Sequence, residues 1–153
     1  MANFNADNAA ALAALPPSRV KVNKQHGRVR WFESTYTAPA TSTPQIADTI
    51  TWGELPVGAR VIGPLSSLNY SVGTASSTIN VGDAASAARH LAATSVASAG
   101  NTALANPSNG AASFETTDGS GAATDNCTLI STVAGAAIAA NQVITLRVAY
   151  VLD

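Results

Sequence analysis

The stretch Leu55–Asp83, which reads LPVGARVIGPLSSLNYSVGTASSTINVGD, contains three short runs of β-forming residues, and a glycine ends each run. Arg60 is the only charged residue between Val57 and Gly82. Short runs with little charge and regular glycine interruptions are typical of antiparallel strands that pack into a core. The runs and their final glycines are Ala59–Ile62 with Gly63, Leu68–Val72 with Gly73, and Thr78–Val81 with Gly82.

The segments that follow this stretch extend the same pattern. In Gln142–Leu152, apolar residues occupy nearly both faces, which predicts a strand in the middle of a sheet. Asn126–Val133 and Ser113–Thr117 are also expected to form strands. We expect a turn at Asp118–Gly121 and a loop over Gly100–Gly110.

Residues 83–100 are ambiguous between helix and strand. Asp83 is a suitable helix N-cap, and residues 84, 88, 91 and 92 fall on one helical face. Thr94–Val96 instead favours a strand. We expect a helical turn over Ala84–Arg89, followed by a strand over His90–Ala97.

The part of the chain that precedes Leu55 begins with a low-complexity arm, residues 1–18, in which Ala9–Leu15 can form a short helix. Residues 19–37 predict a half-exposed strand, or a hairpin that turns at Asn23–Gly27. A Pro-, Thr- and Ser-rich linker follows at Ala38–Pro44, and Ile46–Trp52 alternates like a strand. The apolar positions of the first strand segment are Val20, Val22, Val29 and Trp31.

Together these segments give eight to ten short strands separated by polar turns. This spacing predicts an all-β fold, with an antiparallel β-sandwich or jelly-roll-like body, or a barrel. We expect one β-sandwich domain over residues 19–153, preceded by the extended arm.

The composition predicts a thin core. Leu, Ile, Val and Phe account for 32 of the 153 residues, and Ala alone accounts for another 32. Apolar burial stabilises by roughly 25 cal/mol per Å², and Ala contributes little area, so this core is weak on its own. We therefore expect the chain to gain stability from other copies, as a homodimer or homotrimer.

Cysteine content and hydropathy restrict the compartment. Cys127 is the only cysteine, so no disulfide can form within the chain, and we expect a buried thiol. We find no signal peptide and no apolar run of membrane-spanning length, so we expect synthesis in a cytoplasm and no membrane partner.

The charges are distributed unevenly along the chain. Residues 1–30 carry five basic groups and one acidic group, a net of +4, whereas residues 31–153 carry three basic and eight acidic groups, a net of −5. A basic end of this kind suits an acidic surface, which could be nucleic acid, another copy, or a different protein. Only two aromatic residues accompany the basic run, so a protein interface is favoured over single-stranded nucleic acid. The predicted interface residues are Arg19, Lys21, Lys24, Arg28, Arg30, Trp31 and Phe32.

No catalytic, cofactor or metal site emerges from the sequence, and we expect no small-molecule substrate. His26 and His90 are the only histidines, and their separation does not match a metal site. We expect His26 on the surface and His90 in a packing or interface role. The segment Asp118–Asp125 lacks the acid spacing of a calcium loop, and it is not followed by the Lys of a phosphate loop. The carboxylates are expected mostly on solvated faces rather than as a hydrolytic pair: Glu33, Asp48, Glu54, Asp83, Glu115, Asp118 and Asp125.

Three segments resemble the small structural proteins of tailed bacteriophages, nearest to the capsid decoration or cement proteins: ELPVGARVIGPLSSLNYSVGTASSTINVGDA, HLAATSVASAG and TLISTVAGAAIAANQVITLRVAYVLD. The resemblance covers residues 46–153. It implies a β-sandwich or jelly roll that binds as an oligomer to the outer face of the capsid and staples major capsid subunits. It implies no catalytic residue, and it locates the protein in the virion after assembly in the host cytoplasm.

Two other hypotheses remain open on the sequence. One is a different phage component, such as a tail or adaptor protein or a carbohydrate-binding head. The other is a small hydrolase on a β-scaffold. Many copies per particle would indicate a cement protein, and few copies would indicate a tail part.

Overall fold

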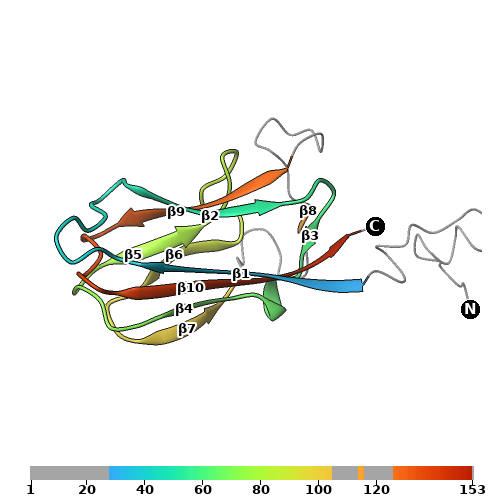
Figure 1. Ribbon diagram of the computed structural model, residues 1–153. Helices are drawn as coiled ribbons and strands as arrows, with labels where there is room; N and C mark the ends of the chain where they lie inside the picture. Colours follow the sequence, from blue (N-terminus) through green and yellow to red (C-terminus); the bar gives the residue numbers. More distant parts are fainter. Residues whose placement is uncertain (1–27, 105–113, 116–125, 153) are drawn as a thin grey trace, which may run out of the picture.

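The computed structural model describes residues 28–104, 114–115 and 126–152. Two antiparallel sheets face each other and form a sandwich (Figure 1). In these residues the only helical element is a single 3-10 turn, η1 (Gly63–Leu65). The predicted all-β fold is confirmed. The predicted arm, the segment 19–27 and the turn at 118–121 lie outside the described residues.

The larger sheet is built around β10 (Val143–Leu152). Along one edge, β10 pairs over its whole length with β1 (Arg28–Thr37). Along the other edge it pairs first with β4 (Ser67–Tyr70) and then with β3 (Arg60–Val61). The predicted position of β10 in the middle of a sheet is therefore confirmed. The outermost strands beyond β4 and β3 are β7 (Gly100–Ala103) and β8 (Phe114–Glu115), respectively.

The smaller sheet has the order β2 (Thr49–Leu55), β9 (Cys127–Ala134), β5 (Thr78–Val81) and β6 (Leu91–Ser95). The pairing of β2 with β9 shifts register at Gly53, whose φ of +140° favours glycine. A Cβ at this position would lie 3.0 Å from the ring of Phe32 on β1. The bulge therefore makes room for an aromatic side chain of the facing sheet.

The core lies between the two sheets and follows the two-residue period of the strands. Along β9, every second residue from Cys127 to Val133 is buried. On β10, Ile144, Leu146 and Val148 face inward and are fully buried. The outer face of β10 is partly open to water, because Arg147 is exposed and Val143 is 39% exposed. Its central position thus comes from pairing on both edges rather than from burial of both faces.

The predicted helical turn over Ala84–Arg89 is wrong, because these residues form successive turns that are not helical. The Asp83 carboxylate caps the first turn as expected. The backbone N–H of His90 then donates to the Val81 carbonyl at 2.9 Å, which draws the chain back to the sheet. The strand predicted after the turn is confirmed as β6.

Other differences concern weakly patterned segments. Gly100–Ala103, predicted as part of a loop, forms strand β7. Its small residues do not predict a strand, but backbone pairing with β4 holds them in the sheet. Ile46, the first residue of the strand predicted over Ile46–Trp52, is 59% exposed, because positive φ at Ala47 (76°) turns the chain before β2 begins. The strand also extends beyond the predicted Ile46–Trp52, since β2 continues to Leu55.

Candidate binding surface

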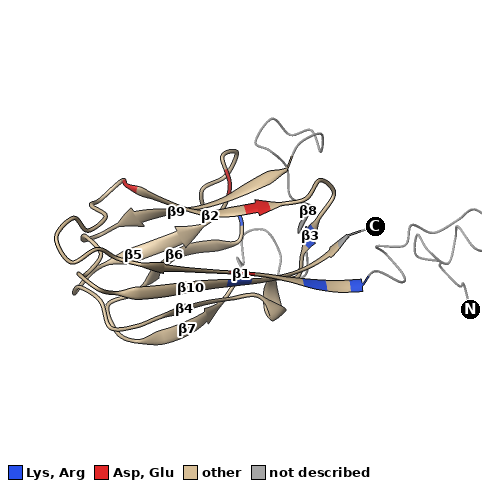
Figure 2. Ribbon diagram, viewed as in Figure 1, with Lys and Arg blue, Asp and Glu red and all other residues tan. Residues whose placement is uncertain are grey.

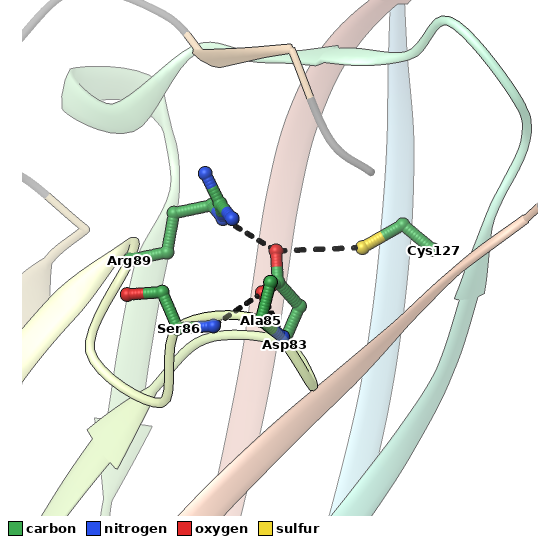
Figure 3. A network of polar contacts seen from close by, with 5 residues as sticks. All are labelled: Asp83, Ala85, Ser86, Arg89 and Cys127. Carbon is green, nitrogen blue, oxygen red and sulfur yellow. Dashed lines mark hydrogen bonds and ion pairs between the residues drawn. The ribbon is translucent and has the colours of Figure 1, made fainter. Parts of the chain in front are cut away.

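The most connected polar group in the described chain is the buried carboxylate of Asp83 (Figure 3). Its Oδ1 accepts the backbone N–H groups of Ala85 at 3.0 Å and Ser86 at 2.8 Å. Its Oδ2 lies 2.5 Å from Nε of Arg89 and 3.8 Å from Sγ of Cys127. Turn donors and a guanidinium therefore satisfy both oxygens, as a buried carboxylate requires.

The neighbouring sequence is adapted to this turn. Gly82 precedes the aspartate, and a Cβ there would lie 2.0 Å from the Ser86 carbonyl oxygen. Gly82 also exchanges two backbone hydrogen bonds with Ile130 of β9, both of 2.9 Å. The network thus fixes residues 83–89 to the smaller sheet. The expectation that the carboxylates lie on solvated faces is wrong for Asp83.

His90 and Cys127 are buried beside this network, which confirms the predicted buried thiol and agrees with packing, one of the two roles expected for His90. Burial lowers the pKa of His90 to about 4; nearby Asp83 opposes this shift, and Arg89 adds to it. The imidazole is therefore neutral at pH 7. The ring, the carboxylate and the thiol are all buried, and backbone hydrogen bonds fix this turn to the smaller sheet.

The remaining described carboxylates are exposed, and each has a partner of its own. Glu33 of β1 pairs with Arg147 of β10 at 2.6 Å. Asp48 accepts the backbone N–H of Gln45 at 2.7 Å, and Glu54 accepts from the side chain of Asn126 at 3.2 Å. No group of three metal-binding side chains occurs among the described residues. His26, Asp118 and Asp125 lie outside them, as does the side chain of Glu115.

The outer face of the larger sheet can be reconstructed from its register. Residues opposite each other in neighbouring antiparallel strands share a face, so Val29, Val151 and Arg60 form one row across β1, β10 and β3. The next row joins Trp31 to Ala149. Further along, the rows become polar, with the Glu33–Arg147 ion pair and a 2.9 Å hydrogen bond between Thr35 and Thr145.

The first two rows leave large apolar side chains in water. Trp31 is 60% exposed and Val29 is 48% exposed. Across β10, Ser66 holds Ala149 by accepting its backbone N–H at 2.9 Å, and the preceding residue, Leu65 of η1, is 53% exposed. Val29 and Trp31, the apolar positions of the predicted half-exposed strand, therefore lie on its exposed face. The inward positions of β1 are instead Phe32, Ser34 and Tyr36.

Three arginines accompany these apolar side chains. Arg28 and Arg30 are exposed at the start of β1, and Arg60 is half-buried on β3 (Figure 2). None of the three forms an ion pair with a described side chain, and that of Glu115, opposite Arg60, is not among these; Arg89 and Arg147 each form one. We call the combined set the β1 patch; its members are Arg28, Val29, Arg30, Trp31, Arg60 and Leu65.

The backbone of β1 is itself available for contact. Within the described part of the chain, β1 pairs only with β10, so its second edge carries no strand. Ten residues make it the longest of the edge strands, compared with seven in β2, five in β6 and four in β7. A long edge without a bulge is a template for pairing with another chain.

The predicted interface residues map only in part onto this surface. Arg28, Arg30 and Trp31 belong to the β1 patch, while Phe32 is half-buried and packs against the core. Arg19, Lys21 and Lys24 lie outside the described residues. Sequence reasoning missed Arg60 and Leu65, because only the pairing of β3 with β10 and the turn at η1 bring them next to β1. The predicted interface stays a prediction.

Comparison with known proteins connects this fold to virus particles. A chain of the cyanophage Pam1 capsid asymmetric unit is 28% identical to this chain, with a TM-score of 0.68 and coverage of 100% of both chains. A chain of the acid-stable capsid of Helicobacter pylori bacteriophage KHP30 is 19% identical, with a TM-score of 0.44, and the match covers 82% of this chain and 94% of that one. No family model and no curated protein matches the chain.

The resemblance to phage capsid-associated proteins is confirmed by the first of these similarities. The match spans the whole chain, not only residues 46–153. A search of the described residues for helices long and apolar enough to cross a membrane found none.

Proposed function

We propose that this protein is a structural component of a phage virion that binds the outer capsid surface as a decoration or cement protein and staples major capsid subunits. The observation that carries the proposal is the full-length similarity to a chain of a phage capsid asymmetric unit, at a TM-score of 0.68. Because the similar chain belongs to a capsid, the comparison also favours this proposal over a tail or adaptor protein.

The arrangement of side chains supports a binding role rather than catalysis. The buried titratable groups near Asp83 are engaged with one another and with turn backbone. The exposed side chains of the β1 patch are those that anchor interfaces, Trp and Arg in particular. We therefore propose that the protein is not an enzyme and that it acts by contact alone.

We further propose that the protein works as a homodimer or homotrimer, made in the host cytoplasm and then carried on the particle. The scarcity of large apolar residues in the sequence supports this. Several weak contacts per oligomer would add up to firm attachment. Light scattering on the purified protein should give two or three times the chain mass.

The experiment that tests the main proposal compares particles assembled with and without the gene for this protein. Quantitative mass spectrometry of complete particles should find copy numbers comparable to those of the major capsid protein. Particles without the protein should have closed shells that rupture at lower temperature, and adding the purified protein should restore their resistance.

The alternative outcomes are distinct. If no shells form without the protein, it is a shell-building subunit rather than a decoration protein. If only a few copies are present per particle, it is a tail or adaptor part. If the protein is absent from particles, the proposal is wrong.

A further inference from the structure

We propose that the free edge of β1 accepts an extended, acidic segment of a shell subunit, which adds as a further strand to the larger sheet, with the β1 patch holding its side chains. This inference rests on the proposed function, which it deepens by naming the surface and the chemistry of the partner.

The backbone provides the first part of the argument. A free strand edge presents rows of unpaired N–H and C=O groups, and a peptide that adds there is held by main-chain hydrogen bonds. The register of β1 with β10 runs without a shift from Arg28 to Thr37, so the edge is continuous. The edge strand of the smaller sheet, β2, is interrupted by the bulge at Gly53.

The side chains provide the second part. An added strand would lay alternate residues over the same face as Val29 and Trp31, which are 48% and 60% exposed. On the opposite parity of β1 lie Arg28 and Arg30, and Arg60 stands beside Val151 in the row of Val29. Apolar contact on one face and guanidinium groups around it suit a segment that mixes apolar and acidic residues.

Charge also decides between possible occupants. The chain's own residues 1–27 carry Arg19, Lys21 and Lys24 against the single acid Asp7, so they would bring positive charge to a positive patch. In an antiparallel pair of β1 with the β1 of a second copy, the basic start of each strand would lie against the uncharged end of the other, so Arg28 and Arg30 would gain no acidic partner. An acidic segment of a different chain would neither repel these arginines nor leave them unpaired.

Binding of purified protein to shells that lack it tests the inference directly. Trp31→Ala should weaken binding at least tenfold, whereas the matched control Val72→Ala should bind like the wild type, because Val72 is similarly exposed at the opposite end of the sheet. Charge reversal in Arg28→Glu/Arg30→Glu should weaken binding and flatten its dependence on salt, since ions screen the attraction between exposed charges.

Photo-crosslinking identifies the occupant. With p-benzoylphenylalanine at position 31, ultraviolet light should join the protein in complete particles to an Asp- and Glu-rich peptide of a shell subunit. The same group at position 72 should not yield that peptide. An adduct at position 31 with this protein's own sequence, with DNA or with a basic peptide would overturn the inference.

The two levels of failure are separable. If the wild-type protein does not bind shells, the proposed function is wrong, and this inference falls with it. If the wild type binds and Trp31→Ala binds equally well, the proposed function stands and the inference is wrong.

Discussion

The turn at Asp83 and the start of β1 both contain arginines, but the arginines serve different purposes in the two regions. At the turn, an aspartate, an arginine, a histidine and a cysteine lie close together, and Asp83 has a hydrogen-bonding partner for each oxygen. At the start of β1, Trp31 and two arginines face water, and neither arginine forms an ion pair with a described side chain. The difference separates groups that hold the fold from groups available to a partner, and residue type alone does not reveal it.

The largest effect on stability should come from Asp83→Ala. The change leaves the Arg89 guanidinium and two turn N–H groups without their acceptor, which we expect to lower the free energy of unfolding by about 3 kcal/mol. Urea denaturation measures this. The control Glu54→Ala removes an exposed carboxylate and should change stability by about 0.5 kcal/mol or less. Equal effects of the two changes would contradict the structural role of the turn.

The second effect is a dependence of stability on pH that arises from His90. Its pKa of about 4 in the folded protein is below the ordinary value of 6.5, so the unfolded chain binds a proton first as the pH falls. This contribution is present above pH 6.5 and is lost toward pH 4, by about 2 kcal/mol between pH 7 and pH 5. Urea midpoints at both pH values measure it. In His90→Gln this part of the slope should vanish; an unchanged slope would show that the ring titrates alike in the folded and unfolded protein.

A smaller effect is expected where an ion pair is exposed. Glu33 and Arg147 are 55% and 52% exposed, so water screens their attraction. Glu33→Gln should lower the free energy of unfolding by about 0.5 kcal/mol, and less at high salt. Thermal unfolding at low and high salt checks this. A loss as large as that of Asp83→Ala would remove the distinction between the buried and exposed pairs.

The smallest effect on folding should come from Trp31→Ala. Because most of this side chain is in water, the free energy of unfolding should change by about 0.5 kcal/mol or less, although we expect shell binding to drop at least tenfold. Urea denaturation of the free protein provides the measurement. A marked loss of stability would mean that Trp31 belongs with the residues that hold the fold.

The strands that could be predicted from the sequence are those with a clear hydrophobic pattern or with glycines at their ends. Cys127–Ala134 and Val143–Leu152 alternate clearly, and the glycine-ended runs before residue 83 became β3, β4 and β5. The face of β1 could not be predicted, because aromatic residues occupy both parities: Trp31 on one, and Phe32 and Tyr36 on the other. Only the pairing with β10 and the bulge at Gly53 decide which side points inward.

The candidate surface was predicted less completely than the fold. Arg28, Arg30 and Trp31 were found as a basic run with an aromatic residue, since they are adjacent in sequence. Arg60 and Leu65 come from a distant segment, and nothing in a one-dimensional pattern places them beside β1. The burial of Asp83 escaped prediction for a similar reason, because Gly-Asp is an ordinary turn signal whether the turn is open to water or closed by a neighbouring strand.

The placement of β10 bears on how the protein is made. Because β1, β3 and β4 all pair with β10, which follows them in the chain, none of them can complete its ladder until β10 has been synthesised and has left the ribosome. Glu33 lies 114 positions before Arg147, its ion-pair partner, in the chain. Until then the nascent chain exposes several unpaired strands at once, and contacts this distant in sequence form slowly. Bacterial expression at low temperature, or together with chaperones that bind nascent chains at the ribosome, should therefore improve the soluble yield.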